Sequence, residues 1–431
     1  MHASDRQQHQ LTSRQLQRAL YRAAKRSRTR RFHALYDRTF RPDVLWRAWK
    51  EVRANKGECG IDGISIEDIG RGGVEEFLRR LAEELKANRY HPKPVRRVYI
   101  PKPDGRKRPL GIPCIRDRVV QQACRIVIEP VFEAVFENCS YGFRPKRSAR
   151  QAVVEVKESL IRSWWVVDAD IQGFFDNVTH STLLDLARRR ISDRRVLKLI
   201  RLWLESGVIE DGRFTRTEKG TPQGSPISPL LANIYLHVLD RHWMLECSSL
   251  GKLIRYCDDF VIVCRTESQA KQALREVEAI RGKLSLTLHP EKTRVVDPKK
   301  ECFDFLGFSF RKWESRKSGK LLPYAWPGRK AMKRARMRLG ELTAARWLRI
   351  PLPEIVRWLN EVIVGWRNYF SFGNGTRQFQ ALDDYVHMRL LRFFRRKMGS
   401  RAKGVRRRFE DWLKNSGIEP FFQKGIFGQA R

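Results

Sequence analysis

Apolar and polar residues follow two different patterns along this chain, and the pattern changes near residue 315. Before that point, short apolar runs of the kind found in strands separate amphipathic stretches with the period of a helix. After it, Trp358, Val362, Trp366 and Phe370 recur every four residues, as expected for a helix that faces a core. The pattern predicts a mixed α+β body followed by a helical C-terminal domain in which strand signals fade.

Within the body, capping residues, prolines and turn dipeptides divide the chain into individual elements. Basic helices are expected over 11–54, with a break before Pro42, and a hairpin with a Pro-Asp-Gly turn is expected over 95–113. The other predicted helices cover 74–90, 118–136, 225–245 and 267–284, and the other predicted strands lie within 164–178, 255–264, 286–296 and 303–310.

The stretch "RYCDDFVIVC", residues 255–264, places Asp258 and Asp259 between two strand-like runs. Neighbouring side chains on a strand point to opposite faces, so a plain strand would bury one of the two carboxylates. Burying an unpaired carboxylate costs several kcal/mol, which argues for a turn. The turn either leaves both aspartates in solvent or presents them to a metal ion.

The net charge of the chain indicates which class of molecule it binds. The chain carries 87 Lys and Arg against 48 Asp and Glu, a net charge of +39. The excess lies at the two ends, because residues 1–40 hold 10 basic and 2 acidic residues and residues 320–431 hold 25 and 8. A protein that neutralises many phosphates benefits from such a charge, so a nucleic acid is the expected partner.

Chain length, apolar runs and cysteine spacing indicate the number of domains and the cellular environment. With 431 residues, 42% of them hydrophobic, the chain is long enough for two or three domains. No apolar run reaches the ~18 residues of a membrane span, and the N-terminus lacks the apolar core of a signal peptide. The eight cysteines are scattered without a Cys-x-x-Cys pair. We therefore expect no membrane partner and a bacterial cytoplasmic location at RNA or the nucleoid, with an organelle as the less favoured alternative.

A second carboxylate pair lies about ninety residues upstream. In "VVDADIQGFFD" an apolar strand delivers Asp168 and Asp170 on the same face. Phosphoryl transfer to a 3′-hydroxyl uses two divalent cations, and Mg²⁺ takes a few carboxylates together with substrate oxygens. A strand that ends in an aspartate beside an Asp-Asp hairpin would supply this site for two Mg²⁺ ions, with Mn²⁺ as an alternative.

Seven blocks, in order, resemble those of group II intron-encoded reverse transcriptases, also called maturases. "YCDD" at 256–259 resembles the Tyr-x-Asp-Asp box of that family. The other blocks are "IPKPDGRKRPLGIP" at 100–113, "SYGFRP" at 140–145, "DADIQGFFDNVTH" at 168–180, "GTPQGSPISPLLANIYL" at 220–236, "LTLHPEKTRV" at 286–295 and "FLGF" at 305–308. The resemblance covers about residues 50 to 400.

The resemblance implies roles for individual residues. Asp170, Asp258 and Asp259 would be the catalytic carboxylates that bind the metal ions, while Asp168 is interpreted as structural. The other implied roles are triphosphate binding by Lys102 and Arg108, exclusion of a ribose 2′-hydroxyl by Phe175, a place in the nucleotide pocket for Gln223, and either a pyrophosphate or a template contact for Lys292. Leu306 and Gly307 resemble the family's primer-grip turn.

The resemblance also implies a right-hand polymerase of α+β class. We expect a basic helical N-terminal extension at 1–49, fingers and palm at 50–314, a helical thumb or maturase X domain at 315–398, and a short basic nucleic-acid-binding tail at 399–431. This layout is similar to that of the short family members without a His-Asn-His endonuclease domain.

The expected activity is RNA-directed DNA polymerisation, with help in splicing and mobility of a host group II intron. The implied partners are that intron RNA, an RNA template with a DNA primer, target DNA and deoxynucleoside triphosphates. Two alternatives stay open: an RNA-binding splicing factor with a vestigial polymerase, and a reverse transcriptase domesticated by a retron or a CRISPR-type defence system. The sequence leaves the oligomeric state open.

Overall fold

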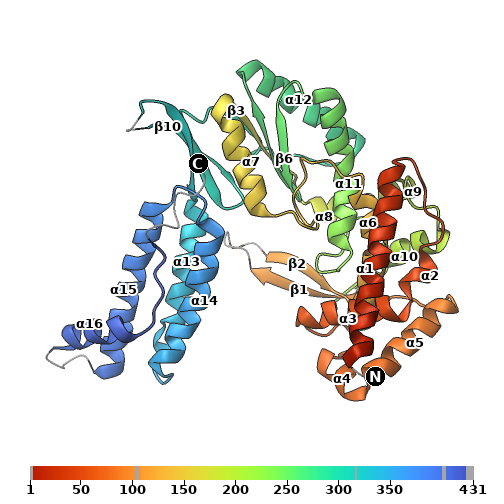
Figure 1. Ribbon diagram of the computed structural model, residues 1–431, viewed down its shortest axis with the longest axis horizontal. Coiled ribbons are helices and arrows are strands. Elements are labelled where there is room, and N and C mark those ends of the chain that lie inside the picture. The colour runs from red at the N-terminus through yellow and green to blue at the C-terminus, as the bar shows by residue number, and fades with distance from the viewer. Residues whose placement is uncertain (1–2, 102–104, 106, 316–317, 400–403, 424–431) are drawn as a thin grey trace.

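The computed structural model describes residues 3–101, 105, 107–315, 318–399 and 404–423, and it has the predicted α+β class. Its centre is a four-stranded antiparallel sheet in the order β6–β7–β3–β8 (Figure 1). The strands are β3 (Trp165–Asp170), β6 (Lys252–Tyr256), β7 (Asp259–Cys264) and β8 (Arg294–Val296). β3 carries Asp168 and Asp170, as predicted, and β6 and β7 flank the Asp258–Asp259 pair.

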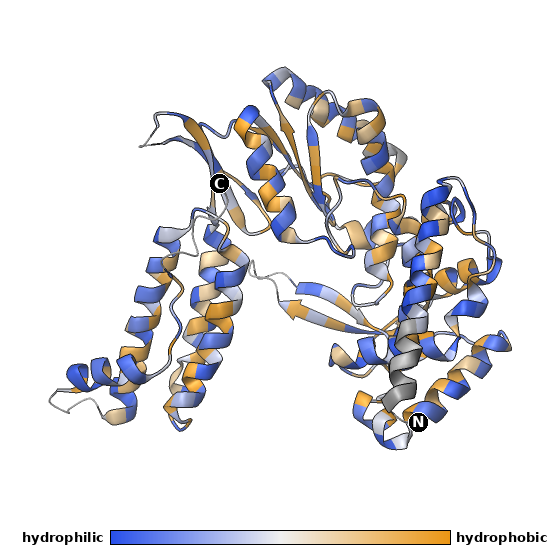
Figure 2. Cartoon of the chain, in the orientation of Figure 1, coloured by the Kyte–Doolittle hydropathy of each residue, from blue (hydrophilic) through white to orange (hydrophobic). Residues whose placement is uncertain are grey.

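Both faces of this central sheet are buried. Along β7, Val261 and Val263 enter a core shared with α7 (Ala149–Arg162). The alternate residues Phe260 and Ile262 enter a second core, shared with α11 (Ser228–His242) and α12 (Glu267–Lys283). Figure 2 shows long hydrophobic segments on the strands of this sheet. Burial on both sides explains why the strand after Asp259 is a continuous apolar run rather than an alternating one.

A second sheet, in the order β2–β1–β4–β5, carries the predicted hairpin. Strands β1 (Val95–Pro101) and β2 (Lys107–Ile112) pair antiparallel, and β1 also pairs with β4 (Val208–Glu210), which is followed by β5 (Arg213–Thr215). In Figure 1 this hairpin extends from the N-terminal helices toward the C-terminal ones. Residues 102–104 and 106 of its turn lie outside the described residues.

The N-terminal helices share the second core with the central sheet. On α1 (Ala3–Arg26), Leu20 and Ala24 are buried, and α1 and α3 (Pro42–Ala54) both pack against α6 (Ile115–Glu133). The predicted break before Pro42 is confirmed, since this proline occupies the first turn of α3, where its missing N–H costs nothing. The remaining helices of this region are α2 (Tyr36–Thr39), α4 (Ile66–Gly72), α5 (Val74–Lys86), α8 (Phe174–Asn177), α9 (His180–Arg188) and α10 (Arg194–Leu204).

The prediction that strands fade past residue 315 was wrong. A third sheet, in the order β11–β10–β9, includes β11 (Leu321–Pro327), which pairs along the whole of β10 (Phe308–Glu314). Prolines 323 and 327 obscured β11 in the sequence, because proline disfavours strands. They are tolerated because β11 is an edge strand. The boundary predicted between residues 314 and 315 falls within this hairpin.

The C-terminal part is helical, as predicted. Helices α13 (Arg329–Leu342), α14 (Leu352–Phe370) and α15 (Thr376–Met398) lie side by side, followed by the shorter α16 (Val405–Asn415) (Figure 1). The predicted row on α14 does face a core, because Phe370 is buried and Trp358, Val362 and Trp366 pack against the same cluster. None of the described helices combines the length and apolar composition needed to cross a bilayer.

Candidate functional site

Asp258 and Asp259 lie at a tight hairpin turn between β6 and β7. Tyr256 pairs with Asp259, which leaves Cys257 and Asp258 as a two-residue loop. Cys257 has a φ of 60°, and Asp258 is not among the residues with positive φ, a combination typical of a type II′ turn. The hairpin packs against backbone: a Cβ on Gly142 would lie 2.4 Å from the amide nitrogen of Cys257. The turn therefore has a fixed position in the fold.

The strand register brings a third carboxylate to this turn. Asp170, the last residue of β3, is the direct partner of Asp259 on β7. Desolvation raises the pKa of Asp259 to about 6, and repulsion by Asp258 and Asp170 adds to the rise. Asp259 is still exposed to solvent, so repulsion by the two neighbouring carboxylates is the main physical cause of its raised pKa. Burial likewise raises the pKa of Asp258, with a further contribution from Asp170. The three predicted carboxylates form one cluster.

Asp168 lies two residues before Asp170 on β3 and opposite Arg294 of β8. Burial raises its pKa to about 7, and Arg294 opposes that rise. The side chain is half-buried within the strand rather than at its end. The structural role of Asp168 stays a prediction.

The turn is supported from beneath by Arg255, a residue whose role the sequence pattern did not indicate. Its guanidinium is fully buried and donates to both carboxylate oxygens of Asp240 at 2.7 and 2.5 Å. It also donates to Asn233, to Ser140 and, at 2.8 Å, to the main-chain carbonyl of Cys257. Burial alone would lower the pKa of Arg255, but the Asp240 carboxylate raises it above its usual value. One buried cation thus ties the Asp-Asp turn to two other segments.

Phe175 lies in the short helix α8, and main-chain hydrogen bonds connect α8 to the loop that carries Gln223 and connect that loop to β2. The amide of Thr221 donates to the carbonyl of Phe175 at 2.7 Å, and the amide of Gly111 on β2 donates to the carbonyl of Gln223 at 2.7 Å. The Phe175 ring is half-buried, with its centroid 5.3 Å from that of Phe174. The predicted sugar contact and the predicted nucleotide-pocket residue are therefore held in neighbouring, hydrogen-bonded segments beside β2.

Two of the three predicted cationic residues lie among the described residues, and both are close to the aspartates. Lys102 lies outside the described residues. Arg108 is exposed on β2, and its charge acts to lower the pKa of Asp258, so it lies near the Asp-Asp turn. Lys292 donates to the Asp170 carboxylate directly. The two described cations of the predicted site thus lie near the three aspartates.

The residues "LG" of the "FLGF" block form a second tight turn, between β9 (Phe303–Phe305) and β10. Leu306 and Gly307 have φ values of 50° and 82°, as in a type I′ hairpin turn. The hydroxyl of Tyr369 on α14 donates to the Leu306 carbonyl at 3.0 Å. The predicted turn is present and is held by the C-terminal helices.

Two protein-family models match this chain. A model described as reverse transcriptase (RNA-dependent DNA polymerase) matches residues 100–310, and a group II intron maturase-specific domain matches residues 332–409. Protein YkfC of Escherichia coli (strain K12) is 34% identical over 365 residues, which cover 75% of this chain and 92% of that protein. The chain belongs to the group II intron-encoded reverse transcriptase/maturase family.

The chain spans different shares of its other relatives and of the solved structures that it matches. The group II intron-encoded protein LtrA of Lactococcus lactis subsp. cremoris is 33% identical over 356 residues, covering 67% of this chain but 59% of LtrA. Among solved structures, a partial Cas6-RT-Cas1–Cas2 complex matches 57% of this chain and 42% of that chain, at 24% identity and a TM-score of 0.36. That structural likeness is too weak to support a functional conclusion.

Proposed function

We propose that this protein is an RNA-directed DNA polymerase that extends a primer 3′-hydroxyl on an RNA template. We also propose that it binds its host group II intron RNA, assists splicing and supports insertion into target DNA. In this proposal the central sheet is the palm, the β1–β2 sheet with the N-terminal helices forms the fingers, and α13 to α15 form the thumb or maturase X domain. The observation that carries the proposal is the register that sets Asp170 opposite Asp259, beside Asp258.

The three carboxylates suit hard divalent cations. Like charges held together at a fixed turn are unfavourable on their own, and carboxylate oxygens are the ligands that Mg²⁺ and Mn²⁺ prefer. Asp170, Asp258 and Asp259 would hold two such ions. When bound, the ions would activate the attacking 3′-hydroxyl and neutralise charge on the triphosphate. Lys292 at Asp170 would then be free to contact the pyrophosphate or the template.

The surrounding residues would select and orient the incoming nucleotide. Arg108, together with Lys102, would bind triphosphate oxygens from the β1–β2 hairpin, since guanidinium groups suit phosphate geometry. Gln223 would line the base side of the pocket, where its loop is already anchored to β2. Phe175 would lie beneath the ribose and exclude a 2′-hydroxyl.

Phe175→Ala is expected to raise the kcat/KM for ribonucleotides relative to deoxynucleotides by about tenfold or more, because the steric barrier to the 2′-hydroxyl is lost. Phe175→Tyr keeps the ring and serves as the matched control, with discrimination retained. The measurement is single-nucleotide incorporation with each substrate. An unchanged ratio in the alanine variant would mean that Phe175 only packs against its neighbour Phe174 and the core behind it.

Two basic surfaces support the RNA-binding half of the proposal. The first follows the end of α1, where all five arginines of residues 22–31 are exposed. The second lies on α13 and α16. A cavity of about 580 Å³ beside α13 is lined by Arg329, Lys333 and Arg336 of that helix, with Trp326 of β11 and Tyr385 of α15. Cations interleaved with aromatic rings fit a nucleic-acid backbone and its bases.

Splicing assistance and polymerisation are expected to separate. Asp258→Ala should still accelerate splicing of the cognate intron RNA at near-physiological magnesium, because the ribozyme carries its own metal ions. Replacing Arg28, Arg30 and Arg31 by glutamine should instead impair splicing more than it impairs primer extension on a short artificial template. The charge-matched control replaces Arg71, Arg79 and Arg80 by glutamine, three arginines that are paired with Asp68 or Glu76.

Parallel loss of both activities in the triple arginine variant would overturn the maturase half of the proposal, as would a wild-type protein that never accelerates splicing. A splicing factor with a vestigial polymerase would show the opposite defect, with splicing but no primer extension by the wild type. The match to a maturase-specific domain at residues 332–409 weighs against a domesticated defence enzyme.

A further inference from the structure

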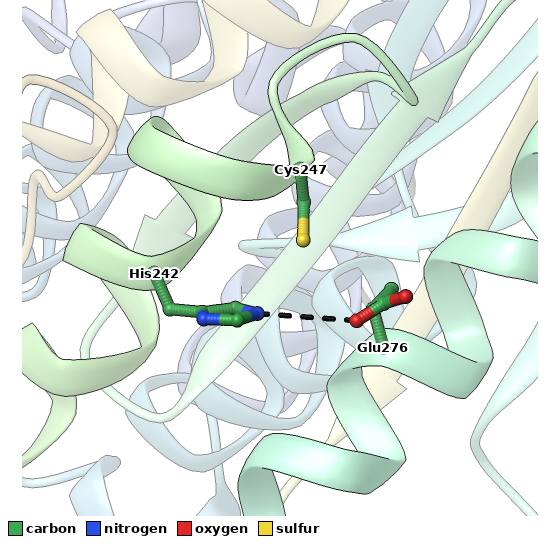
Figure 3. A group of neighbouring side chains, drawn as sticks. All are labelled: His242, Cys247 and Glu276. Carbon is green, nitrogen blue, oxygen red and sulfur yellow. Dashed lines mark ion pairs between the residues drawn. The ribbon is translucent and has the colours of Figure 1, made fainter.

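A cluster of three potential metal ligands lies on the helices behind the central sheet. His242 ends α11, Cys247 ends the π-helix η1 (Trp243–Cys247), and Glu276 lies within α12. Their donor atoms all lie within 4.8 Å of one another. Figure 3 shows the thiol, the imidazole and the carboxylate pointing toward a common space between the helices. None of these residues belongs to the aspartate cluster.

The π-helix is what brings His242 and Cys247 together. In an α-helix, residues five apart are separated by about 140° around the axis and face different ways. A π-helix bonds residue i to i+5, so the fifth residue lies close to the first. Trp243 anchors the segment, because it is fully buried and its indole donates to the carbonyl of Gly251 at 2.9 Å. The unusual helix end thus creates a pair of ligands that α-helical spacing would separate.

The two nitrogens of His242 have different surroundings. Nδ1 lies 3.2 Å from a carboxylate oxygen of Glu246, whereas Nε2 is buried and makes no hydrogen bond to any described residue. The nearest carboxylate oxygen to Nε2, on Glu276, is 3.9 Å away, beyond hydrogen-bonding distance. A carboxylate on one imidazole nitrogen and a metal on the other is the arrangement common in protein metal sites.

We propose that His242, Cys247 and Glu276 form a Zn²⁺ site, with Glu246 orienting the imidazole. A nitrogen, a sulfur and a carboxylate oxygen are the ligands that Zn²⁺ takes, and three protein ligands leave a fourth position for water. A thiolate ligand disfavours Mg²⁺, which requires oxygen donors. Two tetrahedral zinc ligands lie about 3.4 Å apart, so binding requires only a small contraction of the cluster.

The site would join α11 and η1 to α12, the helices that cover one face of the central sheet. α11 follows the loop that carries Gln223, and α12 follows the strand that begins at Asp259. A bound ion would therefore stabilise the support of the candidate polymerase site without taking part in its chemistry. Zn²⁺ binding at this cluster would be independent of polymerase activity, so it can be measured without an activity assay.

The test is cobalt substitution in the 431-residue protein after removal of metal by a chelator. One equivalent of Co²⁺ should produce the visible bands of a tetrahedral ion and a near-ultraviolet thiolate-to-cobalt charge-transfer band. Addition of Zn²⁺ should abolish both and raise the thermal unfolding midpoint. Asp258→Ala should leave the charge-transfer band intact, because the aspartate cluster contains no sulfur ligand.

Ligand variants locate the site. Cys247→Ser should abolish the charge-transfer band, and Glu276→Gln should weaken Zn²⁺ binding by more than about 100-fold. Glu246→Gln should weaken it by about 10–100-fold. The matched controls are Glu278→Gln on an exposed face of α12 and Cys302→Ser outside the cluster, and both should bind like the wild type. Absence of the thiolate band in the wild type, its persistence in Cys247→Ser, or equal losses in the controls would each overturn the proposal.

Discussion

Asp258→Ala is expected to lower the rate of primer extension by about 10³-fold or more while leaving the affinity for RNA near normal or slightly tighter. The three carboxylates around the turn would share two metal ions, and loss of one ligand removes a contribution of several kcal/mol to the transition state. RNA binding should not weaken, because removing a negative charge from a basic protein cannot reduce its attraction for phosphate.

The same loss is expected for Asp170→Ala, since Asp170 faces Asp259 across the β3–β7 ladder. The matched control is Asp176→Ala, an exposed aspartate on α8 a few residues beyond Asp170, which should retain near wild-type extension. The measurements are single-turnover incorporation and equilibrium RNA binding. Full activity in Asp170→Ala or Asp258→Ala would refute the assignment of the metal ligands.

Arg255→Met is expected to be the most damaging single change outside the three carboxylates. It leaves Asp240 buried without its cation, and breaking a buried ion pair in this way costs about 3–5 kcal/mol of unfolding free energy. It also removes the donor to the Cys257 carbonyl, which lies in the Asp-Asp turn. Both stability, measured by urea unfolding, and primer extension should fall.

A double variant separates the two effects. Arg255→Met combined with Asp240→Leu removes both charges, and replacing a buried pair by apolar residues of similar size is often neutral for stability. We expect stability to recover while extension stays at least about tenfold below wild type, because the turn still lacks its support. Full activity in the double variant would show that Arg255 acts only through stability and does not position the turn.

The elements that bear the predicted site could be found from sequence because local signals agreed with the final fold. The strand before Asp170 and the runs flanking Asp258 and Asp259 are apolar and bounded by turns. These local patterns were enough to predict a strand ending at Asp170 and a hairpin at Asp258 and Asp259. Only the structure places Asp170 opposite Asp259, since register between strands about ninety residues apart has no local signal.

Other features were hidden for identifiable reasons. β11 carries two prolines that an edge position tolerates, so its strand character was masked. Arg255 donates hydrogen bonds to Asp240 on another element and to Ser140 on a distant segment, and the sequence does not show that these residues meet. The only signal in the sequence is a charged residue within an otherwise apolar strand. The His242 and Cys247 pair depends on a π-helix, which helical periodicity does not predict.

The most direct test of the central claim is the magnesium dependence of extension by the wild-type protein on an RNA template annealed to a DNA primer. We predict complementary DNA synthesis that rises with Mg²⁺, stops when a chelator removes the ion, and resumes when Mg²⁺ or Mn²⁺ is returned. No extension at any concentration of either ion, or extension that continues in the presence of the chelator, would contradict the account.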